Sequence, residues 1–309
     1  MSFFSHYALF LLESISIAMV VFALIASIMS MGRKPSQGNL TIKSLDKEHL
    51  RVQHLIEKAT GRKKTKLYDK LKNACFVLDF KGDVLASQVD ALRHEISAVL
   101  AVAKPCDEIV IRLESPGGSV NGYGLAAAQL QRIRQRNIPL TVCIDQVAAS
   151  GGYLMACVAN QIIASPFAII GSIGVMAQLP NFHRWLKKHD IDFELLTAGE
   201  YKRTLTMLGE NTAHGRKKFQ ADLDNIHNVF GSYVLSQRNQ LNLKEVTTGE
   251  HWLAADAIKL GLVDTLSTSD DYLQTRRDKF KTYHVALHIK QPWTHKLLKP
   301  LAQCLKAFY

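Results

Sequence analysis

Short apolar stretches alternate with amphipathic ones between residues 75 and 164, and this alternation restricts the possible folds more than any other feature. The strand-like stretches are Cys75–Phe80, Glu108–Leu113, Leu140–Ile144 and Gln161–Ala164. The helix-like segments between and after them are Ser87–Lys104, Val120–Arg136 and Gly151–Ala159. Strands that alternate with helices, and that are apolar without a period of two, predict parallel βαβ units in a sheet covered on both faces.

The remainder of the chain is also typical of a folded protein. Of its 309 residues, 47% are hydrophobic and 21% charged, which is a globular composition. A helical pattern begins after Asn211 and continues to about Gln240. Phe193–Leu196 is strand-like, and Tyr283–Ile289 alternates in the way typical of an edge strand.

The N-terminal segment predicts a membrane anchor over residues 1–31. No charged residue occurs from Ser14 to Met31, and Ile15–Ala26 is apolar almost throughout. Together with Tyr7–Leu12 the segment is long enough to cross about 30 Å of hydrocarbon as one helix. A cleaved signal peptide is the alternative, but neither a basic start nor an Ala-x-Ala-like cleavage site is evident.

Positive charge is concentrated directly after this segment. The net charge is +11, and the connector over residues 32–73 includes the dense run Arg62–Lys66. Such a run beside an anchor indicates either contact with lipid or a solvated linker. By the positive-inside rule, positive charge on this side of the anchor predicts that the large domain lies in the cytoplasm. No zinc-finger, RNA-binding or helix-turn-helix pattern occurs, so no nucleic-acid partner is predicted.

The five cysteines show neither metal-binding nor redox spacing. We therefore predict no disulfide framework and no metal site, and the lack of a disulfide framework favours a reducing compartment. No cofactor is predicted either.

The first glycine-rich corner, Ser115–Ser119, follows a predicted strand. A glycine pair lets the backbone approach a ligand and direct N–H groups at it, as in an oxyanion hole; a plain strand-to-helix turn is the alternative. Gly122–Gly124 forms a partial dinucleotide-binding pattern, which we discount because it lies inside the predicted helix rather than at the turn.

The second corner is Ala148–Tyr153, which places Ser150 between a strand and a helix. Small neighbours leave room for a substrate carbonyl, and N–H groups at a helix N-terminus favour an oxyanion. Ser150 is therefore a candidate nucleophile, with a helix N-cap as the alternative.

A serine nucleophile needs a base, and none of the twelve histidines lies in a recognisable triad setting. His183 and His189 are predicted on the surface of a polar helix, and neither His214 nor His251 belongs to a motif. A lysine base must be neutral, which requires its pKa to fall from about 10.4 to near 7, or roughly 4–5 kcal/mol. Burial supplies shifts of that size. Lys202, after the strand-like Phe193–Leu196, is a candidate, but chemistry alone does not distinguish it from a surface lysine.

Several motifs occur together in the order found in one peptidase family. They are Ser115–Gly118, Ala149–Tyr153, Gly171–Val175 and Gly199–Arg203. From Cys75 to about Ser267 the chain resembles the signal peptide peptidase A family of the ClpP/crotonase superfamily. The anchor, the connector, Gly209–Thr212 and Gly249–Asp264 resemble the SohB-type subgroup in particular.

The resemblance implies an α/β fold with a repeated ββα ClpP/crotonase-like core over residues 74–289. The residues that follow, 290–309, form a basic amphipathic tail. The resemblance implies a Ser–Lys dyad with Ser150 as nucleophile and Lys202 as general base, and with Ser172 orienting the lysine. The implied oxyanion donors are Gly118 and Gly151, with Gly117 as a further candidate.

The resemblance also implies partners and a location. Family members form homo-oligomeric rings, so the lysine could come from the same chain or from its neighbour. Peptides such as signal peptide remnants are the implied substrates, and the bacterial inner membrane is the implied location. Two alternatives are a crotonase-type acyl-CoA enzyme and an inactive membrane scaffold. The tail could lie on the membrane or pack against protein.

Overall fold

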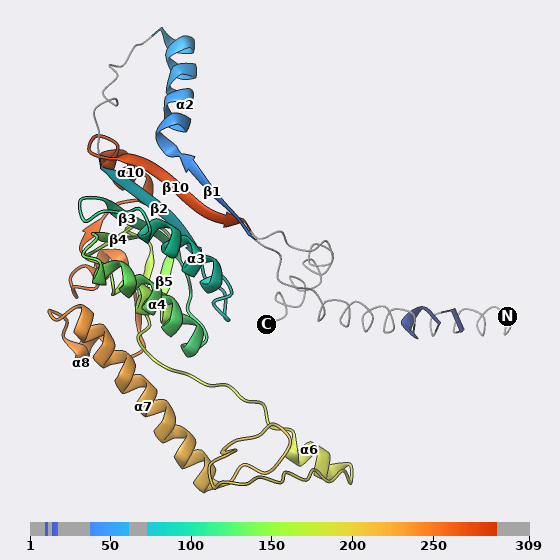
Figure 1. Cartoon of the computed structure of the whole chain (residues 1–309). Coiled ribbons are helices and arrows are strands. Elements are labelled where there is room, and N and C mark those ends of the chain that lie inside the picture. Colours follow the sequence, from blue (N-terminus) through green and yellow to red (C-terminus); the bar gives the residue numbers. More distant parts are fainter. Residues whose placement is uncertain (1–9, 12–13, 18–37, 62–72, 289–309) are drawn as a thin grey trace. The chain divides into compact units, whose positions relative to one another are not determined.

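The structure is a computed structural model that describes residues 10–11, 14–17, 38–61 and 73–288 (Figure 1). It divides into two compact units, residues 1–40 with 287–309, and residues 41–286. In the described part, no helix has both the length and the apolar character needed to cross a membrane. Most of the predicted anchor and the whole tail over 290–309 lie outside the described residues. The boundaries predicted at 31, 73 and 289 therefore stay predictions.

A seven-stranded sheet forms the centre of the fold, with the strand order β1-β10-β2-β3-β4-β6-β9. All the pairings from β10 to β9 are parallel. The strands are β1 (Asn39–Ser44), β2 (Ala74–Lys81), β3 (Glu108–Glu114), β4 (Leu140–Ile144), β6 (Gln161–Ala164), β9 (Thr265–Leu266) and β10 (Lys281–His288). This arrangement confirms that the fold is α/β, and it confirms the predicted strands β2, β3, β4 and β6.

Successive strand residues point to opposite faces of the sheet, and both faces are covered. On one face, Leu78 and Ile111 pack in the main core with residues of three helices. These helices are α3 (Val89–Leu100), α4 (Val120–Gln135) and α5 (Gly151–Ala156). On the other face, Val77 and Val110 pack with residues of α10 (Ser269–Arg276). Each predicted βαβ helix is thus present, slightly shorter than predicted.

A second, three-stranded sheet positions the second glycine-rich corner. It consists of β5 (Val147–Ala149), β7 (Ile169–Gly171) and β8 (His251–Leu253). β5 and β7 are parallel, and β7 and β8 are antiparallel. An isolated bridge from Ser115 to Ala148 connects this sheet to the end of β3. Both glycine-rich corners therefore meet at the carboxyl ends of strands, where α/β folds place their sites.

Two predicted features are wrong. β10 is not an edge strand, because β1 lies beyond it in the sheet. Phe193–Leu196 is not a strand: the segment is exposed and belongs to neither sheet. A strand needs a partner for its backbone N–H and C=O groups, and alternating apolar side chains do not supply one. Within the connector, α2 (Leu45–Thr60) accounts for the weak helical periodicity found there.

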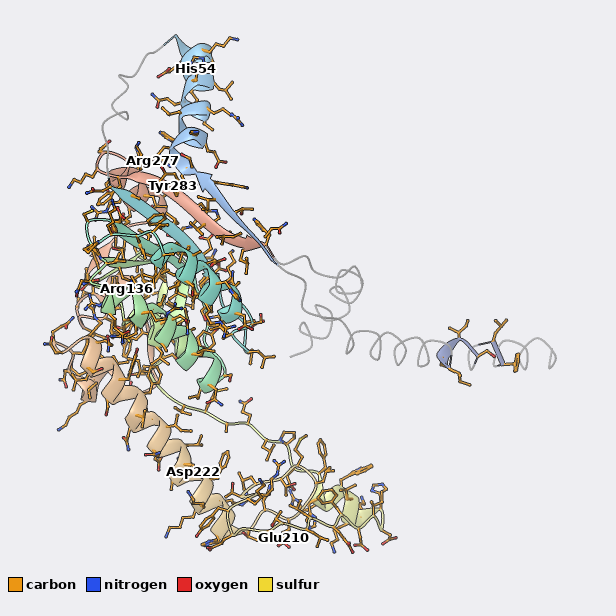
Figure 2. The ribbon with its side chains drawn as sticks, in the orientation of Figure 1. His54, Arg136, Glu210, Asp222, Arg277 and Tyr283 are labelled. Carbon is orange, nitrogen blue, oxygen red and sulfur yellow. The ribbon has the colours of Figure 1, made fainter. Side chains whose placement is uncertain are left out.

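The segment from residue 176 to residue 218, which we call the arm, extends away from the sheet (Figure 1). It contains α6 (His183–Lys188) and the first turns of α7 (Ala213–Gln237). In the arm only Gly209 and Gly215 are buried. Side chains around Glu210 and Asp222 project outward from the arm and from α7 (Figure 2). α7 reaches the core at its other end, where Val234 is fully buried and the following Arg238 pairs with Asp264. Two short helices, α8 (Leu243–Val246) and α9 (Ala254–Ala257), lie between α7 and α10 in the sequence.

Candidate active site

Ser150 lies at the corner between β5 and α5 in an unusual backbone conformation. Its φ is 52° and its ψ is −119°, a region that costs a residue other than glycine about 1–3 kcal/mol. Two hydrogen bonds hold it there: its N–H donates to the Gly171 carbonyl at 2.7 Å, and its carbonyl accepts from the Leu154 N–H at 3.0 Å. The side chain makes no capping hydrogen bond to α5. The helix-cap alternative therefore lacks the bond that defines it.

The first glycine corner lies directly against Ser150. Gly117 has a φ of +90°, and a Cβ added to it would lie 2.7 Å from the Ser150 Cβ and 2.9 Å from the Gly151 nitrogen. A side chain at this position would therefore collide with the serine as well as strain the backbone. The turn at Ser115–Ser119 is thus more than a connection between a strand and a helix.

A buried chain of hydrogen bonds fixes this turn. The Gly117 N–H donates to the Ser115 Oγ at 3.1 Å, and that oxygen lies 2.6 Å from the Tyr123 hydroxyl. The Tyr123 hydroxyl in turn donates to the Asp83 carbonyl at 2.9 Å. Burial raises the pKa of Tyr123, which keeps its hydroxyl protonated as a donor.

The role of Tyr123 was not predicted from the sequence, in which Tyr123 stands out only as part of the Gly122–Gly124 dinucleotide-binding pattern. In the structure, Gly122 is instead a close-packing position, where a Cβ would lie 2.8 Å from the Leu85 carbonyl oxygen. A tyrosine beside two glycines in a core helix was the available signal.

The three predicted oxyanion donors differ in their hydrogen bonding. The Gly117 N–H is already bound to Ser115. Gly151 is the first residue of α5, so its N–H has no acceptor within the helix. In the described part of the chain, the Gly118 N–H has no hydrogen-bond partner either. Gly151 directly follows Ser150 and Gly118 directly follows Gly117, so both N–H groups are available to stabilise negative charge on a substrate oxygen.

The structure brings Ser172 to the same corner. β5 and β7 pair in parallel with Ala149 opposite Gly171, the residue whose carbonyl accepts from Ser150. The next residue, Ser172, also has a positive φ, of 52°, and its N–H donates to the Glu250 carbonyl at 2.6 Å. Ser150 and Ser172 are therefore held at adjoining positions of the small sheet.

Lys202 lies elsewhere, exposed in the arm. Its neighbour Tyr201 stacks on His214 with ring centroids 5.9 Å apart. The backbone after Lys202 packs closely against the first turn of α7, because a Cβ added to Gly215 would lie 2.3 Å from the Thr204 carbonyl oxygen. From Gly215, roughly 28 Å of helix leads to Val234 in the core. The predicted strand before Lys202 is absent, so the lysine does not follow a strand end.

Histidines do not take the place of the lysine. His183 and His189 belong to or adjoin α6 in the arm, as predicted for a surface helix. His214 lies 3.5 Å from Glu200, and His251 is exposed at the start of β8. Among the residues that the structure describes, no histidine bonds to Ser150, and no cluster of His, Cys, Asp and Glu side chains could hold a metal ion.

Comparison with known proteins identifies the family. Residues 132–282 match peptidase family S49, and residues 2–130 match the N-terminal region of the same family. The probable protease SohB of Haemophilus influenzae is 45% identical over 92% of this chain and 89% of its own length. The chain belongs to peptidase family S49. The SohB-type resemblance and the prediction of a serine-type endopeptidase are thereby confirmed.

A second relative supports the same family by sequence identity, whereas the similarity to solved structures is weaker. The probable protease SohB of Buchnera aphidicola subsp. Schlechtendalia chinensis is 44% identical over 89% of this S49 peptidase and 100% of its own length. Among solved structures, a point mutant of the 1510-N membrane-bound stomatin-specific protease, in complex with a substrate peptide, matches 75% of this chain and 99% of its own. That match has 16% identity and a TM-score of 0.46.

Proposed function

We propose that this S49 peptidase is a membrane-anchored endopeptidase with a ClpP/crotonase-like core, in which Ser150 is the nucleophile and Lys202 the general base. The observation that carries the proposal is the conformation of Ser150. A serine held in a strained conformation, with no capping bond and beside two unpaired N–H groups, fits a nucleophile better than a structural residue.

The chemistry follows from these groups. The Ser150 Oγ attacks the carbonyl carbon of a peptide bond while neutral Lys202 accepts the hydroxyl proton. The Gly118 and Gly151 N–H groups bind the resulting oxyanion. The ammonium group of Lys202 then protonates the departing amine, leaving an acyl group on Ser150. Water, deprotonated by the same lysine, then attacks the acyl group and releases the carboxylic acid product from Ser150. Ser172 orients the lysine from the adjoining position.

The lysine of each site comes from a neighbouring protomer in this proposal. Lys202 of the same chain is exposed in the arm, whereas Ser150 precedes a helix of the core. The arm also exposes large apolar side chains that a second copy would cover: Met176, Leu179, Phe182, Trp185, Ile191, Phe193, Leu195, Leu196, Tyr201, Met207 and Leu208. Removing water from the arm favours the neutral amine that a base requires.

A mixing experiment tests both the dyad and its origin. Ser150→Ala and Lys202→Ala homo-oligomers are expected to lose peptide hydrolysis by at least about 10³-fold. Co-expressed in equal amounts, the two variants restore roughly a quarter of the wild-type rate, because one interface in four combines an intact serine with an intact lysine. Arg203→Ala is the matched control and keeps activity. A mixture as inactive as its components contradicts a shared site.

A fluorophosphonate probe tests the nucleophile directly. It is expected to form a covalent adduct on Ser150 of the wild-type protein, located by mass spectrometry, and none on Ser150→Ala. Undiminished peptide hydrolysis by Ser150→Ala would exclude the serine mechanism.

The natural substrates in this proposal are membrane-near peptides, including signal peptide remnants, and the anchor is the helix predicted over residues 1–31. The positive charge that follows the predicted anchor supports a catalytic domain in the cytoplasm. Externally added protease should therefore digest the domain only after the inner membrane is opened. Digestion of the domain in cells whose outer membrane alone is permeable would reverse the orientation.

A further inference from the structure

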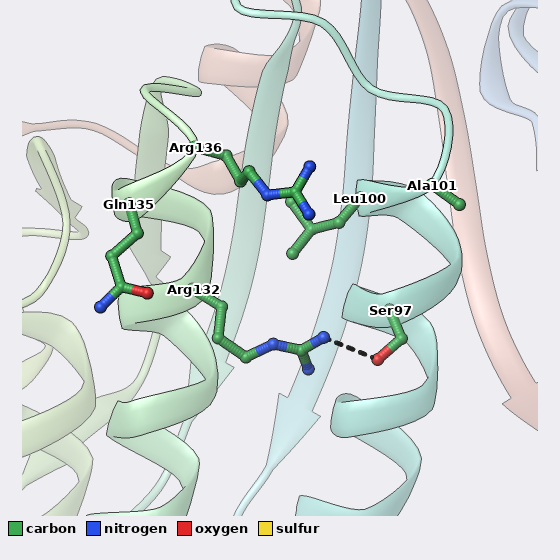
Figure 3. A pocket seen from close by; sticks show the side chains of 6 residues that line it. All are labelled: Ser97, Leu100, Ala101, Arg132, Gln135 and Arg136. Carbon is green, nitrogen blue, oxygen red and sulfur yellow. Dashed lines mark hydrogen bonds between the residues drawn. The ribbon is translucent and has the colours of Figure 1, made fainter.

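A pocket of about 470 Å³ lies between the ends of α3 and α4, away from Ser150. Ser97, Leu100 and Ala101 line it from α3 and the residue after it, and Arg132, Gln135 and Arg136 line it from the end of α4 and the residue after it (Figure 3). In parallel βαβ units the helices end where the next strands begin, at the sheet edge opposite the catalytic corner. The pocket is therefore separate from the proposed active site.

Two arginines give this pocket its charge. Arg132 donates from Nη1 to the Gln129 Oε1 at 2.8 Å and from Nη2 to the Ser97 Oγ at 3.0 Å, and both acceptors are neutral. In the described part of the chain, the Arg136 side chain has neither a hydrogen bond nor an ion pair, and no carboxylate lines the pocket. By contrast, Arg112, Arg238 and Arg276 each have a carboxylate oxygen within 3.1 Å.

The helix dipoles balance only part of this charge. Each helix C-terminus carries about half a negative elementary charge, and the ends of α3 and α4 both lie at the pocket. Two guanidinium groups therefore leave an excess of about one positive charge, which a bound anion would neutralise.

The geometry suits a phosphate group. Arg132 and Arg136 are four residues apart, so their side chains leave α4 on the same side and extend toward α3 (Figure 3). A planar guanidinium group can donate two parallel hydrogen bonds to two oxygens of one phosphate. The Ser97 hydroxyl lies beside the Arg132 guanidinium group and adds a further polar group. Leu100 and Ala101 provide an apolar wall for a small organic substituent. We propose that the α3–α4 pocket binds a phosphate monoester or diester.

Titration calorimetry on the full chain in a non-ionic detergent, at constant ionic strength, tests this site. The probes are inorganic phosphate and glycerophosphoglycerol, a water-soluble diester that represents a lipid headgroup. We expect at least one probe to saturate with a Kd in the millimolar range or tighter. Tighter binding of the diester assigns the pocket to lipid headgroups, and tighter binding of phosphate assigns it to free phosphate groups.

Variants of the three neighbouring arginines separate a built site from general attraction. Arg132→Gln and Arg136→Gln should each weaken binding at least tenfold, while Arg134→Gln changes it less than twofold, because Arg134 does not line the pocket. All three variants should hydrolyse peptide at the wild-type rate. If neither probe saturates, or if Arg134→Gln weakens binding as much as Arg136→Gln, the proposal is overturned.

Discussion

The core and the arm differ in how their residues are held. Around Ser150 the backbone is fixed by hydrogen bonds, and the neighbouring Tyr123 and Tyr153 are fully buried. In the arm, α6 has no buried residue, and Leu196 is 90% exposed. The same chain thus contains a rigidly supported Ser150, the proposed nucleophile, and an exposed Lys202, the proposed base.

This difference separates two requirements of catalysis. A nucleophile and its oxyanion donors need precise geometry before substrate arrives, which a packed core supplies. A lysine base needs removal from water, which an exposed arm obtains only when something covers it. A substitution in the core should therefore change folding stability, whereas a substitution in the arm should change mainly assembly or activity.

The largest expected effect in the core concerns the ion pair that attaches α7 to it. Asp264 binds Arg238 at 2.6 Å, and the Arg238 side chain is 4% exposed. Asp264→Asn leaves a buried guanidinium without its counter-charge and, because the Asp264 side chain is about a third exposed, should lower the free energy of unfolding by about 2–3 kcal/mol. Urea unfolding of the full chain in detergent measures the change.

The matched control for this pair lies on the part of α7 that projects from the core. Asp222 pairs with Lys218, and both side chains are at least a third exposed. Asp222→Asn should change the free energy of unfolding by no more than about 0.5 kcal/mol, because exposed pairs contribute little. Equal effects of the two substitutions would remove the distinction between the core and the projecting part of α7.

A second, smaller effect concerns glycines in two core helices. A Cβ at Gly151 would lie 2.4 Å from the Tyr123 ring, whereas a Cβ at Gly124 has no atom within 4 Å. Gly151→Ala should therefore destabilise the protein by about 1–3 kcal/mol through overpacking. Gly124→Ala should stabilise it by about 0.5–1 kcal/mol, because alanine favours a helix. Thermal unfolding of both variants distinguishes the two signs, and a shift of the same sign would contradict this packing at the corner.

Much of the central sheet could be predicted from sequence because burial determines it locally. Strands buried on both faces leave apolar runs, so β4 and β6 have the predicted bounds. Phe193–Leu196 has a similar composition but lies in the arm, where no strand is available as a partner. The side chains of β10 alternate because the two faces of this strand differ in burial, although β10 pairs with β1 on one side and β2 on the other. Pairing partners are tertiary information that a short run does not contain.

The candidate site could be predicted to a similar extent. Each glycine-rich corner is a local pattern at a strand end, and parallel strands bring such ends together, as the structure does for Gly117, Ser150 and Gly171. The Ser115–Tyr123–Asp83 hydrogen bonds could not be foreseen, because they join residues up to 40 positions apart through a buried hydroxyl. The exposed position of Lys202 in the arm could not be predicted either, because the spacing between Ser150 and Lys202 in the sequence does not determine their separation in the fold.

The smallest predicted effect compares an acidic group of the core with one of the arm. Burial alone would raise the pKa of Asp79, but hydrogen bonds from His284 and Arg112 outweigh it and hold that pKa at about 2. A carboxyl whose pKa is lowered on folding contributes stability above its unfolded pKa, near 3.9, and loses it as the pH falls toward 2. Because Asp79 is about a third exposed, this contribution is roughly 1–2 kcal/mol.

Asp79→Asn should therefore be less stable than the wild type at pH 6, and the difference should shrink steadily between pH 4 and pH 2. Urea unfolding across that range measures it. Asp192, 90% exposed and 4.0 Å from Lys187, is the matched arm residue, and Asp192→Asn should differ little from the wild type at any pH. A constant gap for Asp79→Asn would mean that lost packing, rather than the charge shared with Arg112 and His284, explains its effect. The same pH dependence for Asp192→Asn would show that the arm is held as firmly as the core.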